Sequence, residues 1–128
     1  MTILLDTHLL LWAAEKDPRL PALASEMIRS AESKMVFSSV NIWEVVIKRS
    51  LGRGDFGVDP HRLRSRLLES GYSELSVSSE HALAVGNLPS IHKDPFDRIL
   101  IAQAVTERLT LVTSDQIVAN YPGPIVKV

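Results

Sequence analysis

Four acidic residues occur where the chain is expected to leave a strand or to enter a helix. Asp6 ends an apolar run at residues 2–5, and Asp115 follows a second run at residues 110–113. Glu44 and Asp97 lie in the first turns of two predicted helices. Ligands of open α/β sheets bind beyond the carboxyl ends of the strands, so the four carboxylates can all face one edge of a sheet.

A group of this kind requires positive charge. Two carboxylates about 4 Å apart repel each other by about 4 kcal/mol at an effective dielectric near 20, so a cluster takes up protons or binds cations. The chain has no cysteine, and oxygen ligands alone suit a hard divalent ion such as Mg²⁺ or Mn²⁺. An ion held there can activate a water and neutralise charge on a phosphodiester. Asp6, Glu44, Asp97 and Asp115 are therefore the predicted metal ligands and catalytic residues.

The same acids also have purely structural interpretations. Asp94 precedes Pro95 at a helix start, and an aspartate there accepts hydrogen bonds from free backbone amides. Asp94 followed by Asp97, or Asn41 followed by Glu44, resembles a capping box. We prefer the capping interpretation for Asp94 alone. Four acids at one sheet edge are harder to explain by capping, which favours a shared site.

A basic segment follows the Glu44 helix. Residues 48–66 contain six Lys or Arg against two Asp, whereas the whole chain has a net charge of −1. Such a run is usually a solvated helix face. If it borders an acidic pocket, however, Lys48, Arg49 and Arg53 are the predicted contacts to substrate phosphates.

Short apolar strands alternate with helices along the chain, which predicts one α/β domain over residues 1–128. The handedness of the crossovers favours a three-layer α/β/α sandwich around a mostly parallel sheet. The five expected strands lie at residues 2–5, 35–37, 73–77, 110–113 and 124–128.

Three of the expected helices are informative. Apolar residues cover almost the whole circumference of the helix from residue 95 to about 108, which predicts a buried helix. A second helix is expected from residue 20 to about 32. In the helix after residue 38, Val40, Trp43, Ile47 and Leu51 share one face, with Glu44 beside it.

Length and composition limit the class of protein. A chain of 128 residues with 45% hydrophobic residues can bury a core without disulfides or structural metals. The N-terminus lacks the basic region of a signal peptide, and no apolar run approaches the roughly 18 residues of a membrane span. We expect a soluble cytoplasmic protein that does not enter a membrane.

Four blocks of this sequence together resemble PIN-domain ribonucleases of the VapC toxin type. They begin at Asp6-Thr-His, Ser38, His92-Lys-Asp-Pro-Phe-Asp-Arg and Leu111-Val-Thr-Ser-Asp, in matching order and spacing. The resemblance implies a Mg²⁺-dependent endoribonuclease that acts as the toxin of a toxin–antitoxin pair. It also implies an RNA substrate, a homodimer and a cognate antitoxin that silences the toxin.

The resemblance carries over to individual positions. Asp6, Glu44 and Asp97 match the three core acids of the family, and Asp115 matches a fourth, more variable one. Supporting hydroxyl positions are matched by Thr7, Ser38 and Thr113. No role follows from the resemblance for His92 or Asp94.

Two alternatives stay open. The chain could be a catalytically silent PIN-like module that binds a protein partner, with its carboxylates serving only as helix caps. An aspartyl-phosphate enzyme on a similar sheet is a further possibility, although His8 stands where that chemistry expects a second acid. Among the other histidines, we expect His61 and His81 at the surface.

Overall fold

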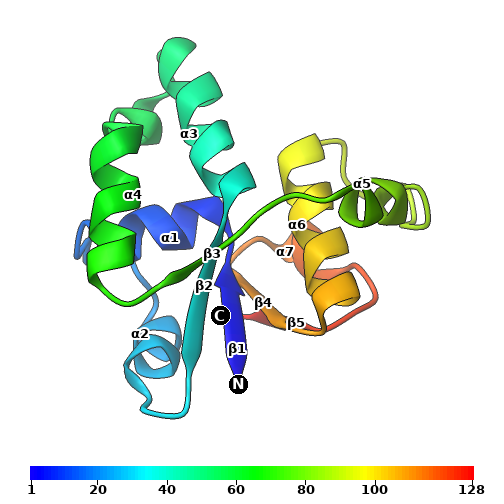
Figure 1. The fold of residues 1–128 in the computed structure, drawn as a ribbon, viewed down its shortest axis with the longest axis horizontal. Helices are drawn as coiled ribbons and strands as arrows, with labels where there is room; N and C mark the ends of the chain where they lie inside the picture. Colours follow the sequence, from blue (N-terminus) through cyan, green and yellow to red (C-terminus); the bar gives the residue numbers. More distant parts are fainter.

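Five short strands form one sheet with β1 at its centre (Figure 1). The structure is a computed structural model that describes residues 1–128. All four strand pairs are parallel, in the order β3-β2-β1-β4-β5, which confirms the predicted parallel sheet. The strands are β1 (Thr2–Leu5), β2 (Lys34–Ser38), β3 (Ser73–Leu75), β4 (Thr110–Thr113) and β5 (Ile125–Lys127).

Helices cover both faces of this sheet. They are α1 (Thr7–Ala14), α2 (Ala22–Arg29), α3 (Ser39–Ser50), α4 (Pro60–Glu69), α5 (Ser79–Val85), α6 (Pro95–Glu107) and α7 (Gln116–Ala119), with a 3₁₀ turn η1 (Gly54–Phe56) before α4. Figure 1 shows α1, α2 and α4 on one side and α5, α6 and α7 on the other. No helix is long and apolar enough to cross a membrane.

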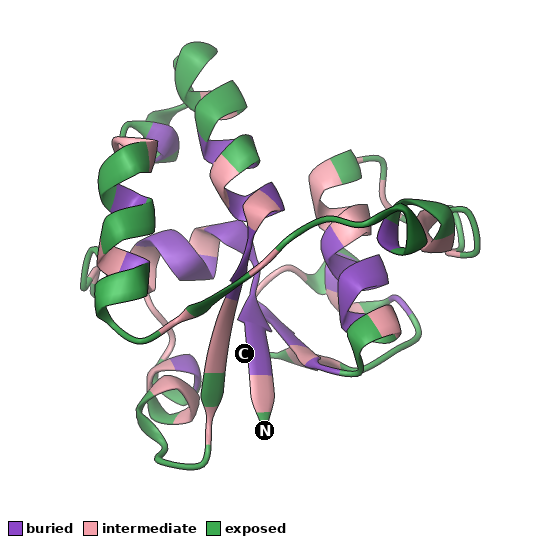
Figure 2. Ribbon diagram, in the orientation of Figure 1, coloured by how far each residue is buried: buried purple, intermediate pink, exposed green.

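Two apolar cores hold the three layers together. Alternate side chains of a strand point to opposite faces, and β1 is buried on both of them (Figure 2). Ile3 and Leu5 pack with α1 and α4, whereas Leu4 packs with α6 and α7. The predicted three-layer sandwich and the predicted buried helix at α6 are both confirmed.

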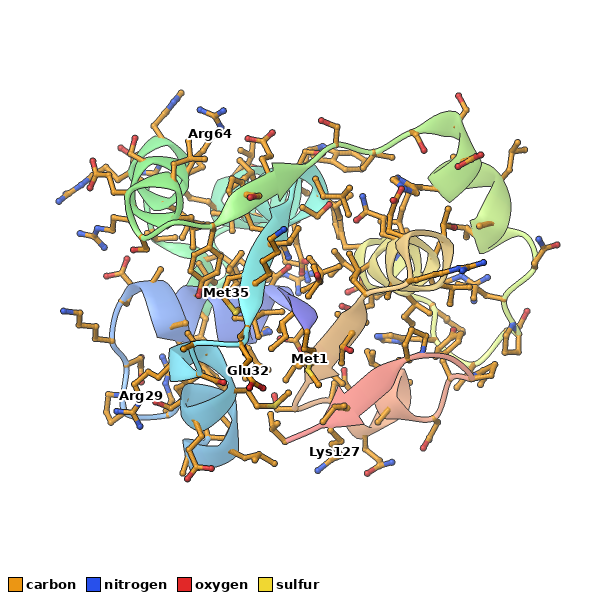
Figure 3. The ribbon with its side chains drawn as sticks, turned by 60° about the horizontal axis from the view of Figure 1, so that its bottom comes forward. Met1, Arg29, Glu32, Met35, Arg64 and Lys127 are labelled. Atoms are coloured by element: carbon orange, nitrogen blue, oxygen red, sulfur yellow. The ribbon has the colours of Figure 1, made fainter.

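The strand order creates a crevice at one end of the sheet. From β1 the chain moves outward through β2 to β3 and then returns to the other side of β1 as β4. The carboxyl ends of β1 and β4 therefore flank a topological switch point, where ligands bind in open α/β folds. Figure 3 turns the opposite, amino-terminal end forward; there the Met1 ammonium donates to the carbonyl oxygen of Glu32, 3.0 Å away.

Helix α3 lies differently from its apolar pattern. Val40 is buried, but the side of α3 with Trp43, Ile47 and Leu51 is exposed, and Glu44 and Val45 point inward instead. The helix extends beyond the carboxyl ends of the short strands, so the sheet does not cover its later turns (Figure 1).

Three smaller expectations need correction. His81 is fully buried rather than at the surface, because its ring accepts from the Ser78 amide and contacts the Glu107 carboxylate. Helix α2 is shorter than predicted and begins after Pro21, which fits the position before a first helical residue. Strand β3 ends at Leu75, two residues before the predicted end.

Candidate active site

A polar cavity of about 390 Å³ opens at the carboxyl ends of β1 and β4. Its walls come from the strand ends, α1, the middle of α3, the start of α6 with the segment before it, and η1. The lining residues are Asp6, Thr7, His8, Trp12, Glu44, Lys48, Asp55, His92, Asp94, Asp97, Ser114 and Asp115. All four acids singled out in the sequence thus line one cavity.

Asp6 is the buried acid at the carboxyl ends of the strands. It follows β1 and caps α1, where its Oδ1 accepts a hydrogen bond from the Leu9 amide at 2.9 Å. The Thr113 hydroxyl at the end of β4 donates to Oδ2 at 2.5 Å. Burial raises the pKa of the Asp6 carboxyl above its ordinary value. The neighbouring strands therefore fix this carboxylate while disfavouring its charge.

Glu44 is held from both ends of its carboxylate. Its Oε1 accepts a hydrogen bond from the Thr7 hydroxyl at 2.5 Å, and the Asn41 amide supports Thr7 at 2.9 Å. Its Oε2 contacts the Lys48 ammonium at 2.5 Å, one turn along α3. With only 2% exposure, Glu44 is almost sealed from solvent, so the lysine supplies the charge that its burial requires.

The start of α3 differs from one sequence interpretation. Asn41 does form a capping box, but with Ser38 rather than with Glu44: its Oδ1 accepts from the Ser38 amide at 2.8 Å, and Ser38 accepts from Val40 at 3.0 Å. Glu44 is consequently free of any capping role. Ser38 contacts none of the carboxylates and supports the site only by starting this helix.

Two aspartates stand at the head of α6. Asp94 caps the helix, accepting from the Phe96 amide at 2.9 Å, and its other oxygen lies 3.4 Å from the Lys48 ammonium. Burial, together with the negative charges of Asp94 and Glu44, raises the pKa of Asp97 from 3.8 to about 7. The Asp97 carboxyl is therefore partly protonated at neutral pH, and a bound cation would favour its ionised form.

Asp115 and His92 complete the rim. Asp115 caps α7 through the Ile117 amide at 2.8 Å, and its side chain is 41% exposed. The Nε2 atom of His92 lies 2.8 Å from the Asp97 Oδ2 and 4.0 Å from the Asp115 Oδ2. His92, Asp94 and Asp97 bring ligand atoms within 4.8 Å of one another.

The predicted basic contacts are separated by the structure. Lys48 lines the cavity between the Phe56 and Phe96 rings, with its ammonium 5.1 and 5.7 Å from their centroids. Arg49 and Arg53 are exposed, and neither lines this cavity. Arg49 instead lines a separate surface pocket. Lys48 is therefore the one lysine or arginine in the cavity.

The donor set fits a hard divalent cation. Carboxylates from four separate elements line one cavity, no cysteine is present, and the neighbouring charges of Asp94 and Glu44 add to burial in raising the pKa of Asp97. Oxygen donors in this arrangement are those that Mg²⁺ and Mn²⁺ take in proteins.

Sequence patterns did not identify three residues of this arrangement. The sequence indicates Asn41 only as a possible cap, because its second contact, to Thr7, depends on the sheet bringing β1 and β2 together. The sequence predicts that Asp94 caps α6, which it does, but Asp94 also contacts Lys48. His92 stands in the segment before α6, where no periodicity signals its orientation.

Comparisons with known proteins identify the family of this chain. The family model for the PIN domain matches residues 3–124. The chain is 26% identical over 123 residues to "Ribonuclease VapC22" of Mycobacterium tuberculosis, covering 96% of this chain and 94% of that protein.

Solved structures show the same fold. VapBC2 from Rickettsia felis, bound to a DNA fragment from its promoter, superposes with a TM-score of 0.71 at 18% identity, covering 99% of this chain and 98% of that one. A toxin–antitoxin complex from Klebsiella pneumoniae gives a TM-score of 0.66 at 19% identity, with coverage of 98% and 96%. At these identities the likeness concerns the fold alone.

Proposed function

The chain belongs to the PIN domain family, and from that premise we propose that it is a Mg²⁺-dependent endoribonuclease, the toxin of a toxin–antitoxin pair. Its similarity to a VapC ribonuclease over nearly its whole length supports the substrate class. The observation that carries the proposal is the cavity in which Asp6, Glu44, Asp97 and Asp115 converge with too little positive charge.

In this proposal the four acids hold Mg²⁺, for which Mn²⁺ can substitute. The bound ion would supply a Lewis acid that neutralises charge on the scissile phosphate and activates water. Thr113 and Thr7 orient Asp6 and Glu44 through their hydroxyl hydrogen bonds. Asp115, half exposed at the rim, is the acid most accessible to incoming solvent.

Basic residues bind the RNA backbone. Lys48 lies inside the cavity within reach of a phosphate there, and its two carboxylate partners keep its pKa raised despite burial, so it stays charged. Arg49 and Arg53 follow it along the chain and would contact phosphates outside the cavity. Such contacts position RNA without reading its sequence.

Two protein partners belong to the proposal. A homodimer would bury the exposed apolar side of α3, where Trp43 and Leu51 are 57% and 63% exposed. A cognate antitoxin is supported by the solved relatives, which are described as VapBC or toxin–antitoxin complexes. Co-expression with the product of an adjacent small reading frame should yield a complex that elutes together and no longer cleaves RNA.

The direct test is cleavage of purified RNA with Mg²⁺ and with excess chelator. We expect cleavage in the first condition alone, and none with Asp97→Asn in either. Glu69→Gln, which removes an exposed acid at the end of α4, serves as the matched control and should cleave normally. Circular dichroism verifies that both variants are folded; a folded Asp97→Asn variant that still cleaves would remove Asp97 from the catalytic set.

The second candidate is a catalytically silent PIN-like binding module. It is favoured by one observation: Asp6, Asp94 and Asp115 all cap helices, so their presence has a structural explanation without a metal. Calorimetric titration separates the two candidates. A saturable Mg²⁺ site that is lost in Asp97→Asn supports the nuclease, whereas the absence of any saturable site supports the binding module.

A further inference from the structure

His92 lies in a segment without regular secondary structure. Residues 86–94 connect α5 to α6, and none of them is in a helix or strand. The side chain of His92 is nevertheless only 18% exposed and lies against the acids of the cavity. An irregular segment needs contacts outside itself to hold one conformation.

Two remote residues provide those contacts. Tyr121, which follows α7 in the chain, is only 4% exposed. Its hydroxyl accepts a hydrogen bond from the backbone amide of His92 at 2.7 Å. Arg98 of α6 donates to the same hydroxyl at 2.9 Å, to the Pro89 carbonyl at 2.9 Å and to the Val85 carbonyl at 3.2 Å. One buried phenol and one guanidinium therefore clamp the segment at both ends.

The clamp directs the His92 ring at Asp97. Nε2 lies 2.8 Å from the Asp97 Oδ2, which is hydrogen-bonding distance, while the Asp97 Oδ1 accepts no hydrogen bond from the protein. When Asp97 is ionised, as a metal ligand must be, its carboxylate accepts this hydrogen bond and Nε2 carries the hydrogen. No other residue donates a hydrogen bond to the Asp97 side chain, so His92 is its one hydrogen-bond partner there.

We propose that His92 is a positioning residue for the metal site, whose Nε2–H fixes the Asp97 carboxylate, with Tyr121 and Arg98 holding His92 in place. The inference rests on the proposed function only in requiring that Asp97 binds a divalent cation. Hydrogen bonds to ligating carboxylates tune metal affinity because they remove orientations that cannot bind.

Mn²⁺ binding to the full chain tests this proposal. By calorimetry, His92→Ala should raise the Mn²⁺ dissociation constant about 10-fold relative to the unaltered chain. His92→Gln, whose amide can still donate to Asp97, should recover most of the affinity, and Tyr121→Phe should weaken binding in the same direction by a smaller factor. His61→Ala, an exposed histidine of α4, is the matched control and should bind as the unaltered chain does.

A spectroscopic measurement distinguishes positioning from direct ligation. In pulsed electron paramagnetic resonance of the Mn²⁺-loaded chain, we expect no signal from a His92 nitrogen bonded to Mn²⁺. The spectra of the unaltered chain and of His92→Gln should therefore agree in this respect. Such a nitrogen would overturn the proposal in favour of direct ligation. An unchanged Mn²⁺ dissociation constant in His92→Ala would also overturn it. So would an equal loss of Mn²⁺ affinity in His92→Ala and His92→Gln, if both variants also lost thermal stability equally.

RNA cleavage is measured separately on the same proteins. If Mn²⁺ affinity depends on His92 but the unaltered chain never cleaves RNA, the positioning inference stands and the nuclease proposal fails. If the unaltered chain cleaves RNA and Mn²⁺ affinity is independent of His92, the nuclease proposal stands and the positioning inference fails.

Discussion

Replacing Asp97 with asparagine should stabilise the metal-free protein while abolishing its activity. Burial, with the nearby charges of Asp94 and Glu44, raises the pKa of the Asp97 carboxyl to about 7. In the unfolded chain the same carboxyl ionises at an ordinary value of 3.8. Between pH 3.8 and about 7, Asp97 therefore keeps its proton in the folded state but has released it in the unfolded state.

The size and the sign of the effect follow from linkage. Stability falls with rising pH wherever the native state binds more protons, by about 1.36 kcal/mol per pH unit for one group. For a pKa displaced from 3.8 to about 7, the loss is about 1.5 kcal/mol at pH 5 and reaches about 4 kcal/mol above pH 7. Asparagine has nearly the same shape and carries no charge, so Asp97→Asn should recover this free energy.

Urea unfolding in excess chelator, at several pH values from 5 to 8, measures the difference. The gap in unfolding free energy between Asp97→Asn and the unaltered chain should widen as pH rises. Contributions from the other titrating groups are largely common to both proteins and cancel. Saturating Mg²⁺ should then stabilise the unaltered chain and leave the variant unchanged, because only the former completes the site.

Parallel stability curves for the two proteins would refute this reasoning. They would mean that Asp97 is ionised in the metal-free protein and that neighbouring groups already balance its charge. The acids of the cavity would then not require a bound cation. A variant less stable than the unaltered chain at neutral pH would have the same meaning.

Three further predictions concern the surroundings of the site. Thr113→Val should destabilise the protein by about 1–3 kcal/mol in urea unfolding and weaken Mg²⁺ binding, because buried Asp6 loses a donor, whereas Thr113→Ser should restore both. Arg49→Ala combined with Arg53→Ala should weaken RNA binding and flatten its dependence on salt in filter-binding assays, with Mg²⁺ affinity intact; an unchanged slope would return both arginines to a solvated face. Trp43→Glu should convert a dimer into a folded monomer by light scattering, and a monomeric unaltered chain would contradict the dimer.

The fold and the convergence of the acids were accessible from sequence because both follow from chain-level rules. Strands alternating with helices predict a parallel sheet, and acids placed at strand ends and helix starts, such as Asp6 and Asp97, then fall at one edge. These inferences need only the order of the elements. The exact end of each element matters little to them.

Contacts that depend on how the elements pack against one another could not be predicted from the sequence. The apolar residues of α3 repeat at helical spacing, but the rest of the protein packs against the side of α3 that carries Glu44 and Val45, so Trp43 is exposed. The burial of His81 depends on a contact between helices, because Glu107 of α6 provides the partner of its ring. The orientation of His92 likewise depends on Tyr121, 29 residues away.

The double use of aspartates as helix caps has an evolutionary consequence. Asparagine caps a helix about as well as aspartate does, so exchanging one for the other at Asp6 or Asp115 keeps the cap and removes only the charge. A single replacement can therefore disarm the molecule without unfolding it. On the proposed function, lineages under pressure to lose the activity should accumulate folded, inactive copies at least as readily as unfolded ones, and such copies would still bind the proposed antitoxin.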